Sequence, residues 1–123
     1  MNVESIIGTA VRDTFFDNAG DNSFDGGGGD DTVHFTAGND YGKGCTVADT
    51  FIFDGVFSDD TIGDVNSAER DKIQISVASN FGQLQMFNIT ADSEPAVMVV
   101  FGASTIALKH LQQSDLHVSD FVV

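Results

Sequence analysis

In the first half of the chain, short apolar segments and polar segments follow one another in a pattern that repeats every nine residues. Short segments such as DTVHF and DTFIF are rich in β-branched and aromatic residues, and stretches rich in glycine and aspartate separate them. The first kind of segment favours strands, and glycine favours tight turns that need a positive φ. The pattern predicts five turn-plus-strand blocks: GTAVRDTFF (8–16), DNAGDNSFD (17–25), GGGGDDTVH (26–34), FTAGNDYGK (35–43) and GCTVADTFI (44–52).

The second half of the chain has few glycines and longer apolar runs. We expect it to cap the open end of the repeats, which would otherwise expose strand edges. The predicted elements are a strand at 72–77, a short amphipathic helix at 79–87, and two strands at 96–102 and 104–111 around a turn at Gly102 and Ala103. The expected core of this cap is Phe81, Leu84, Phe87, Val99, Phe101, Ile106 and Leu108.

The repeats predict the architecture. One block cannot bury its own apolar face, so blocks must stack on one another. If each block is half a turn, the eighth positions point inward as two rows, Phe15, Val33 and Phe51 on one sheet and Phe24 and Gly42 on the other. We therefore predict an all-β fold, a parallel β-roll of two sheets with a C-terminal β-rich cap that contains a short helix. It forms a single domain over 1–123, with the array at 8–64 and the cap at 65–123.

The sixth position of every block is an acid or an amide. The stacked coils place Asp13, Asp31 and Asp49 on one edge, and Asn22 and Asp40 on the other. Carboxylates one strand spacing apart, about 4.8 Å, cannot all stay ionised without a cation between them. Carboxylates and loop carbonyls are the ligands of Ca²⁺, whereas zinc prefers His and Cys and magnesium needs stricter octahedral geometry. The spacing therefore predicts calcium sites.

The charge of the chain supports this interpretation. Five Lys and Arg stand against 19 Asp and Glu, so the formal net charge is −14. Twelve of the 16 Asp lie between residues 8 and 64. This balance argues against nucleic acid and anionic membranes as partners, because both need clustered bases. A hydrophobic content of 41% with 11 Phe argues against disorder of the whole molecule, and the single cysteine, Cys45, permits no intramolecular disulfide.

One block also resembles a known family. GGGGDDTVH matches the pattern G-G-x-G-x-D-x-apolar-x of RTX (hemolysin-type) calcium-binding repeats at every position. The segment 48–76 is similar to the stretch that closes the parallel β-roll in secreted RTX proteases, lipases and epimerases. Carried over residue by residue, the resemblance implies calcium ligands at Asp13, Asp31 and Asp49 on one edge, Asn22, Asp40 and Asp60 on the other, and loop carbonyls near Gly27, Gly29 and Gly38.

The acids after the array leave two interpretations open. Asp59, Asp60, Asp64 and Asp71 either form one further site or lie in solvated turns.

The end of the chain carries a second resemblance. Asp120, Phe121, Val122 and Val123 look like the terminal motif of type I secretion substrates, whose export signal is C-terminal and is not removed. The first residues, MNVESIIGTAVRD, lack the basic region of a cleaved signal peptide. The resemblance implies a secreted bacterial protein that the type I machinery exports by its C-terminus.

The sequence motifs and the remaining reactive side chains do not predict catalysis. HExxH, GxSxG and phosphate-binding glycine loops are missing, and His34, His110, His117 and Cys45 make no metal-binding or nucleophile–base spacing.

The favoured function is a non-catalytic module that folds on calcium binding after export. The alternative is a calcium-stabilised carbohydrate-binding or adhesin module of a larger secreted protein. A neutral sugar would need exposed aromatics, for which the array offers Tyr41, Phe35 and Phe57, and an anionic polysaccharide would need more bases.

Overall fold

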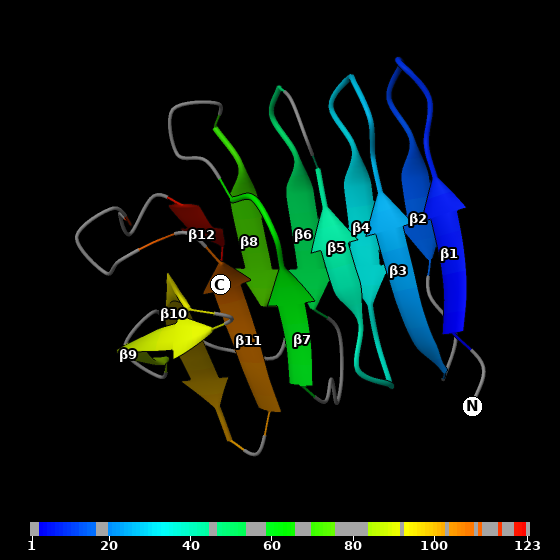
Figure 1. Ribbon diagram of the computed structural model, residues 1–123. Helices are drawn as coiled ribbons and strands as arrows, with labels where there is room; N and C mark the ends of the chain where they lie inside the picture. The colour runs from blue at the N-terminus through cyan, green and yellow to red at the C-terminus, as the bar shows by residue number, and fades with distance from the viewer. Residues whose placement is uncertain are drawn as a thin grey trace.

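The fold is a flattened coil of parallel strands in two facing sheets (Figure 1). The computed structural model describes residues 3–16, 20–44, 47–53, 59–65, 70–75, 84–91, 93–102, 104–109, 111, 116 and 120–122. The seven-stranded sheet has the order β1 (Val3–Ile7), β3 (Asp21–Asp25), β5 (Tyr41–Lys43), β7 (Asp59–Ile62), β11 (Ser104–Lys109), β10 (Glu94–Phe101) and β9 (Gln85–Ala91). The five-stranded sheet has the order β12 (Phe121–Val122), β8 (Lys72–Ile75), β6 (Thr50–Phe53), β4 (Thr32–Phe35) and β2 (Thr14–Phe16).

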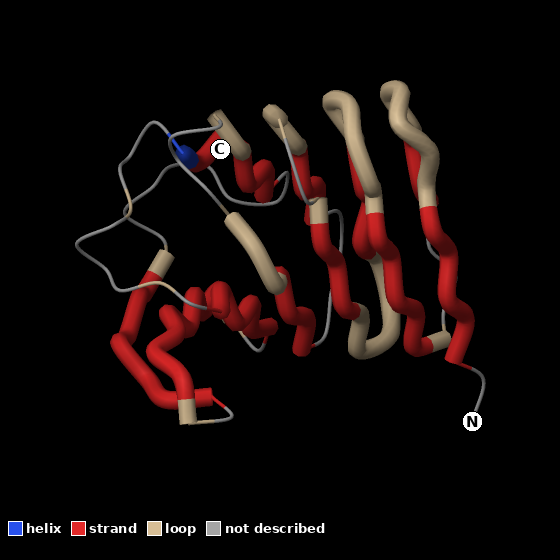
Figure 2. Tube along the Cα trace, turned by 45° about the horizontal axis from the view of Figure 1, so that its top comes forward, coloured by secondary structure: helices blue, strands red, loops and turns tan. Residues whose placement is uncertain are grey.

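The strand register confirms the parallel β-roll. Val33 lies opposite Phe15 on one side and Phe51 on the other, so the repeat is 18 residues in this sheet. From β1 to β8 the chain alternates between the sheets, and each of β1 to β6 pairs in parallel with the strand two elements later. Figure 2 shows the successive coils side by side. The period lengthens at the end of the array, where Thr50 pairs with Lys72 and Tyr41 pairs with Thr61. The paired strands stay parallel across these longer steps.

The core follows the eighth positions, as predicted. Phe15, Val33 and Phe51 are buried in one sheet, and Phe24 and Gly42 are buried in the other. A Cβ at Gly42 would lie 2.6 Å from the ring of Phe35. Phe35 therefore occupies the space above the glycine, and its ring stacks on Phe53 with centroids 4.7 Å apart.

The second half of the chain continues both sheets. β11 pairs in parallel with β7, and β10 and β9 add antiparallel strands beyond it. The strands predicted at 72–77, 96–102 and 104–111 are confirmed as β8, β10 and β11, and Gly102 has the positive φ, 61°, of the expected turn. β12 joins the other sheet beside β8.

The predicted helix at 79–87 is wrong over its described part. Gln85 to Phe87 begin strand β9, which pairs with β10, while 79–83 lie outside the described residues. Leu84 and Met86 contact the core, and Phe87 is 51% exposed. Alternate side chains thus face the core, which is the period of a strand. The edge of β10 favours the strand over a helix because it offers hydrogen bonds to this segment.

The expected core of the cap is otherwise mostly confirmed. Leu84, Val99, Ile106 and Leu108 are buried, Phe101 is half-buried, and Phe81 lies outside the described residues. Within the described part of the chain, no helix is long and apolar enough to cross a membrane.

Candidate metal centre

Four acids form a ladder along one edge of the roll. The carboxylates of the last three accept the backbone N–H of the preceding acid in the ladder. The N–H of Asp13 donates to Asp31 Oδ1 at 2.8 Å, that of Asp31 donates to Asp49 Oδ1 at 2.9 Å, and that of Asp49 donates to Asp71 Oδ1 at 2.9 Å. We call these four residues the first ladder.

The opposite edge carries a second ladder of Asn22, Asp40 and Asp60. The N–H of Asn22 donates to Asp40 Oδ1, and that of Asp40 donates to Asp60 Oδ1, both at 2.8 Å. The amide nitrogen of Asn22 also donates to Asp40 Oδ1 at 3.3 Å and to the Gly20 carbonyl at 2.9 Å. The predicted stacking of both edges is thus present, although the steps lengthen to 20 and 22 residues at Asp60 and Asp71.

The acids after the array do not converge on one further site. Asp60 and Asp71 extend separate ladders, whereas Asp64 Oδ1 accepts the N–H of Gly44 at 2.9 Å. Asp59 Oδ1 accepts the hydroxyl of Thr105 at 2.8 Å on the surface. Asp71 is therefore a ladder residue that the nine-residue spacing alone did not identify. The signal for it is the segment DKIQI, which repeats the acid-plus-strand pattern of DTFIF.

The ladders leave one oxygen of each inner carboxylate without a donor. In the part of the chain that the structure describes, the Oδ2 atoms of four buried acids have no hydrogen-bond partner: Asp31, Asp40, Asp49 and Asp60. Asp31 and Asp49 are each 1% exposed. A buried carboxylate oxygen without a partner is costly, so these positions need a cation or a proton.

Glycine makes room for these oxygens. A Cβ at Gly26 would collide with Asp31 Oδ2 and would lie 3.1 Å from the carbonyl oxygen of Gly44. A Cβ at Gly44 would collide with Asp49 Oδ2 in the same way. A carboxylate oxygen and a backbone carbonyl oxygen therefore lie beside an α-carbon that carries only hydrogen. Such a small space with hard oxygen donors suits Ca²⁺.

The loops supply the turns that the predicted carbonyl ligands need. Gly27, Gly29 and Gly38 have φ of 82°, 86° and 99°. Val47 occupies the fourth position of its block with φ of 74°, a conformation that is unfavourable for a β-branched residue. Val47 thus has the positive φ that Gly29 and Gly38 have at the fourth position of their blocks.

Side chains alone do not complete a site. Among the residues that the structure describes, no three His, Cys, Asp or Glu side chains group together around one point. Any ion at the ladders would take most of its ligands from backbone carbonyls. This arrangement fits calcium better than zinc, which prefers His and Cys.

Burial changes the titration of the first ladder. It raises the pKa of Asp49 to about 7; the hydrogen bond from Asp31 N–H opposes this rise, and the nearby carboxylates of Asp71, Asp31 and Asp64 add to it. Burial also raises the pKa of Asp31 above its ordinary value of 3.8, against the hydrogen bond from Asp13 N–H. Between about pH 4 and about pH 7, the folded chain without calcium therefore binds more protons than the unfolded chain. Its stability therefore falls as the pH rises from about 4 to about 7.

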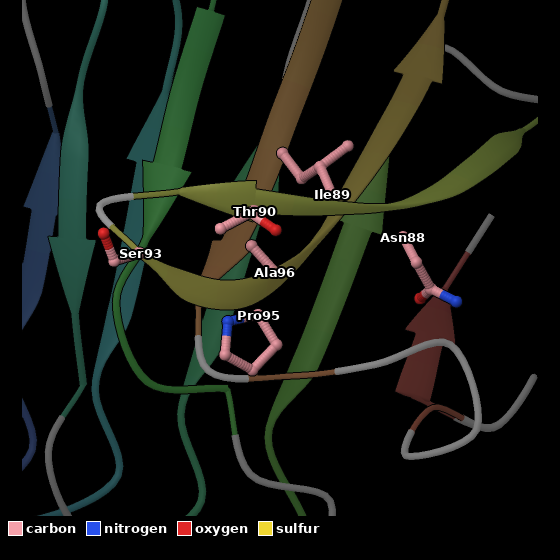
Figure 3. Close-up of a pocket in the computed structure, with 6 residues that line it drawn as sticks. All are labelled: Asn88, Ile89, Thr90, Ser93, Pro95 and Ala96. Atoms are coloured by element: carbon pink, nitrogen blue, oxygen red, sulfur yellow. The ribbon is translucent and has the colours of Figure 1, made fainter.

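The other features with possible chemistry lie away from the ladders. His34 is on the outer face of β4, where its ring stacks on Phe16 with centroids 4.3 Å apart. The depression in Figure 3 lies on the β9–β10 hairpin, and the described residues that line it carry no charge. It is lined by Asn88, Ile89, Thr90, Ser93, Pro95 and Ala96.

Comparison with known proteins agrees with this geometry. Residues 7–41 match the model of the RTX calcium-binding nonapeptide repeat in four copies. This segment therefore consists of RTX repeats, a class of calcium-binding repeat. No curated protein sequence matches the chain significantly.

Solved structures with a similar fold include the extracellular lipase LipA of Serratia marcescens. It is 21% identical with a TM-score of 0.55, and the match covers 97% of this chain and 20% of the lipase. The AlgE6R3 subunit of the Azotobacter vinelandii mannuronan C5-epimerase is 18% identical with a TM-score of 0.37, and the match covers 94% of this chain and 80% of that subunit. The lipase match supports the β-roll fold alone, and this chain spans only a fifth of that protein's length.

Proposed function

We propose that this chain is a non-catalytic module that folds when calcium binds along its two ladders. The observation that carries this proposal is the buried Oδ2 of Asp31 and of Asp49, each without a hydrogen-bond donor beside a loop glycine. The proposed carboxylate ligands on the first ladder are Asp13, Asp31 and Asp49. On the second ladder we propose Asn22, Asp40 and Asp60, and carbonyls near Gly27, Gly29 and Gly38 complete the shells.

Calcium binding would supply free energy that this chain needs in order to fold. Without it, the carboxylates of a chain with net charge −14 repel one another and the inner ones resist burial. Sites of this class outside the cell have dissociation constants of about 10⁻⁴–10⁻³ M. Because the ligands come together only in the roll, the free energy of binding is also free energy of folding.

Far-UV circular dichroism of the full chain tests this proposal. At pH 7.5 the spectrum should change from disordered in excess chelator to β-rich at millimolar calcium, and magnesium at equal concentration should not replace calcium. In chelator, lowering the pH from 7.5 to about 5 should restore part of the β signal, because protons then neutralise Asp49 and Asp31. A β-rich spectrum that strong chelator leaves unchanged would overturn the proposal.

We further propose that export by a type I system precedes folding. Two of the C-terminal residues that resemble the export signal are buried in the fold, since Asp120 is 3% and Phe121 is 7% exposed, whereas Val122 is 45% exposed. Phe121 lies opposite Ile73 as β12 pairs with β8. β8 directly follows Asp71, the last residue of the first ladder. An ordered first ladder would therefore favour pairing of β12 with β8. This pairing would withdraw the C-terminal residues from the transporter.

Deletion of residues 121–123 tests the export proposal. In a host with a type I system, the truncated chain should remain inside the cell while the full chain appears in the medium. Phe121→Tyr keeps an aromatic side chain at the same position and serves as the control, with export expected to persist. Undiminished export of the truncated chain would count decisively against a C-terminal signal.

Carbohydrate binding is the second candidate function. Of the aromatics named from the sequence, Phe35 is fully buried, Tyr41 is 37% exposed and Phe57 lies outside the described residues. Phe16, which the sequence did not single out, is 69% exposed on β2 and stacks on His34. Binding of a neutral glycan to the calcium-loaded chain, lost in Phe16→Ala, would favour this function.

A further inference from the structure

The peptide bond between Asp25 and Gly26 joins β3 to the loop beside the first ladder. The segment reads FDGGGG, so an aspartate directly precedes a glycine. In an unfolded chain, the backbone nitrogen that follows an aspartate can attack the carboxyl carbon of that aspartate. Glycine hinders this attack least, because it has no side chain and its backbone rotates freely. Asp54 and Gly55 form the other such pair in the sequence, and they lie outside the described residues.

Attack at Asp25 isomerises the chain without an enzyme. The Gly26 nitrogen loses its proton and bonds to Cγ of Asp25, and one carboxyl oxygen leaves as water, which closes a succinimide ring. A water molecule then opens the ring at either of its two carbonyl carbons. Opening at Cγ restores aspartate, whereas opening at the backbone carbonyl carbon leaves the chain running through Cγ. This second product is isoaspartate, which has the same atoms as aspartate but a longer backbone.

The folded coil holds this peptide group on both sides. The N–H of Gly26 donates to the Lys43 carbonyl of the next coil at 2.8 Å. The carbonyl of Asp25 accepts the N–H of Gly8 at 2.6 Å, and its carboxylate accepts the N–H of Gly27 at 3.2 Å. Ring closure needs the peptide group to turn toward the carboxylate and to lose its amide proton, so these hydrogen bonds must break first. Backbone groups paired in this way react only when the structure opens.

A longer backbone at this position would disturb the loop. A Cβ on Gly26 would already collide with Asp31 Oδ2. A Cβ on Gly27 would lie 2.6 Å from the Thr9 carbonyl oxygen, and the N–H of Gly28 donates to the same oxygen at 3.0 Å. The loop therefore has no space for another backbone atom, and the turn would move away from the carboxylate that we assign to the ion.

We propose that Asp25–Gly26 is a site of spontaneous aspartate isomerisation, reactive in the unfolded chain and closed in the folded coil. An isomerised chain loses the loop geometry that places Gly26 beside Asp31. The part of this inference that concerns calcium rests on the proposed function. If calcium folds the chain, calcium also protects this loop from covalent damage, and a chain that stays unfolded loses its calcium affinity with time.

Peptide mapping by mass spectrometry of the full chain tests the proposal. Samples are incubated at pH 7.5 in millimolar calcium, in chelator, and in chelator with concentrated urea, and isoaspartate at position 25 is measured over time. It should accumulate about tenfold or more faster in urea than in calcium, because the open loop is a minor state of the folded chain. Equal rates in urea and in calcium, or no isoaspartate at this position in urea, would overturn the proposal.

The chelator sample separates this proposal from calcium-dependent folding. Circular dichroism shows whether the chain in chelator is unfolded. The rate of isomerisation should match the urea rate if the chain is unfolded and the calcium rate if it stays β-rich. A β-rich chelator sample would contradict the proposed function, while the comparison of urea with calcium would still test the closed peptide group. A chelator rate that disagrees with the dichroism would count against protection by the fold.

Refolding of aged samples measures the consequence for the loop. An Asp54→Glu background removes the other Asp–Gly pair. In this background, chains that carry isoaspartate at position 25 should need about tenfold or more calcium for half-maximal folding than a fresh sample of the same variant. Asp25→Glu is the matched control, since glutamate keeps the carboxylate but closes the larger imide ring far more slowly, so its aged and fresh samples should refold alike. An unchanged calcium midpoint of the isoaspartate chains would contradict the predicted damage to the loop.

Discussion

Asp31→Asn should raise the calcium concentration for half-maximal folding by about tenfold or more, equivalent to about 1.4 kcal/mol per factor of ten. The asparagine keeps Oδ1 as the acceptor for Asp13 N–H, which is 2.8 Å away in the native chain. It replaces the buried Oδ2, which has no hydrogen-bond donor, by an NH₂ group that cannot ligate a cation. The variant therefore removes the ligand and its charge while it keeps the hydrogen bond of the ladder. Calcium titration monitored by circular dichroism measures the shift.

Asp30→Asn is the matched control for this variant. Asp30 is the adjacent acid, and its side chain is 45% exposed in a surface pair with Arg12 at 3.6 Å. Such pairs contribute little to stability. The calcium midpoint should therefore change less than about twofold. Equal effects of the two substitutions would show that net charge, rather than the ladder, controls folding.

Gly26→Ala should impair calcium-dependent folding at least as severely. Its Cβ would collide with Asp31 Oδ2 and crowd the Gly44 carbonyl, and both groups are fixed by the stacked coils. The carboxylate would have to leave the position that we assign to the ion. We expect the calcium midpoint to rise by about tenfold or more, and calorimetry should detect fewer bound ions per chain.

Gly28→Ala separates this effect from the general cost of replacing glycine. Gly28 lies in the same loop, and its nearest neighbour for a new Cβ is the Ala10 backbone at 3.5 Å, an ordinary contact. Its φ is not positive, unlike the φ of Gly27 and Gly29. The midpoint for Gly28→Ala should stay close to that of the native chain. A similar loss in both alanine variants would argue against a specific space beside Asp31.

The nine-residue period was sufficient to predict the roll, because it fixes two properties at once. The eighth positions select the inward row of Phe15, Val33 and Phe51, and the sixth positions select the acids that the ladder hydrogen bonds join. Both rows arise because equivalent positions of successive repeats lie one above another along the coil. No knowledge of distant contacts was needed.

The parts that the sequence did not predict depend on contacts between distant segments. Asp71 joins the first ladder 22 residues after Asp49, so a search at fixed spacing misses it. β1 and β12 have no repeat pattern and become strands because β3 and β8 offer them edges. Over residues 84–87 the apolar pattern is too short to distinguish a helix from a strand. Pairing with β10 decides the outcome.

The carboxylates of Asp31 and Asp49 each use their two oxygens in different ways. One oxygen holds the backbone of the preceding coil, and the other remains beside the loop glycine. Removal of 18 residues, for example 17–34, would join the chain at positions that already occupy the same place in successive coils. The roll can therefore change in length by whole coils with little change in its local contacts. The number of coils is then a variable that selection can adjust separately from the structure of each coil.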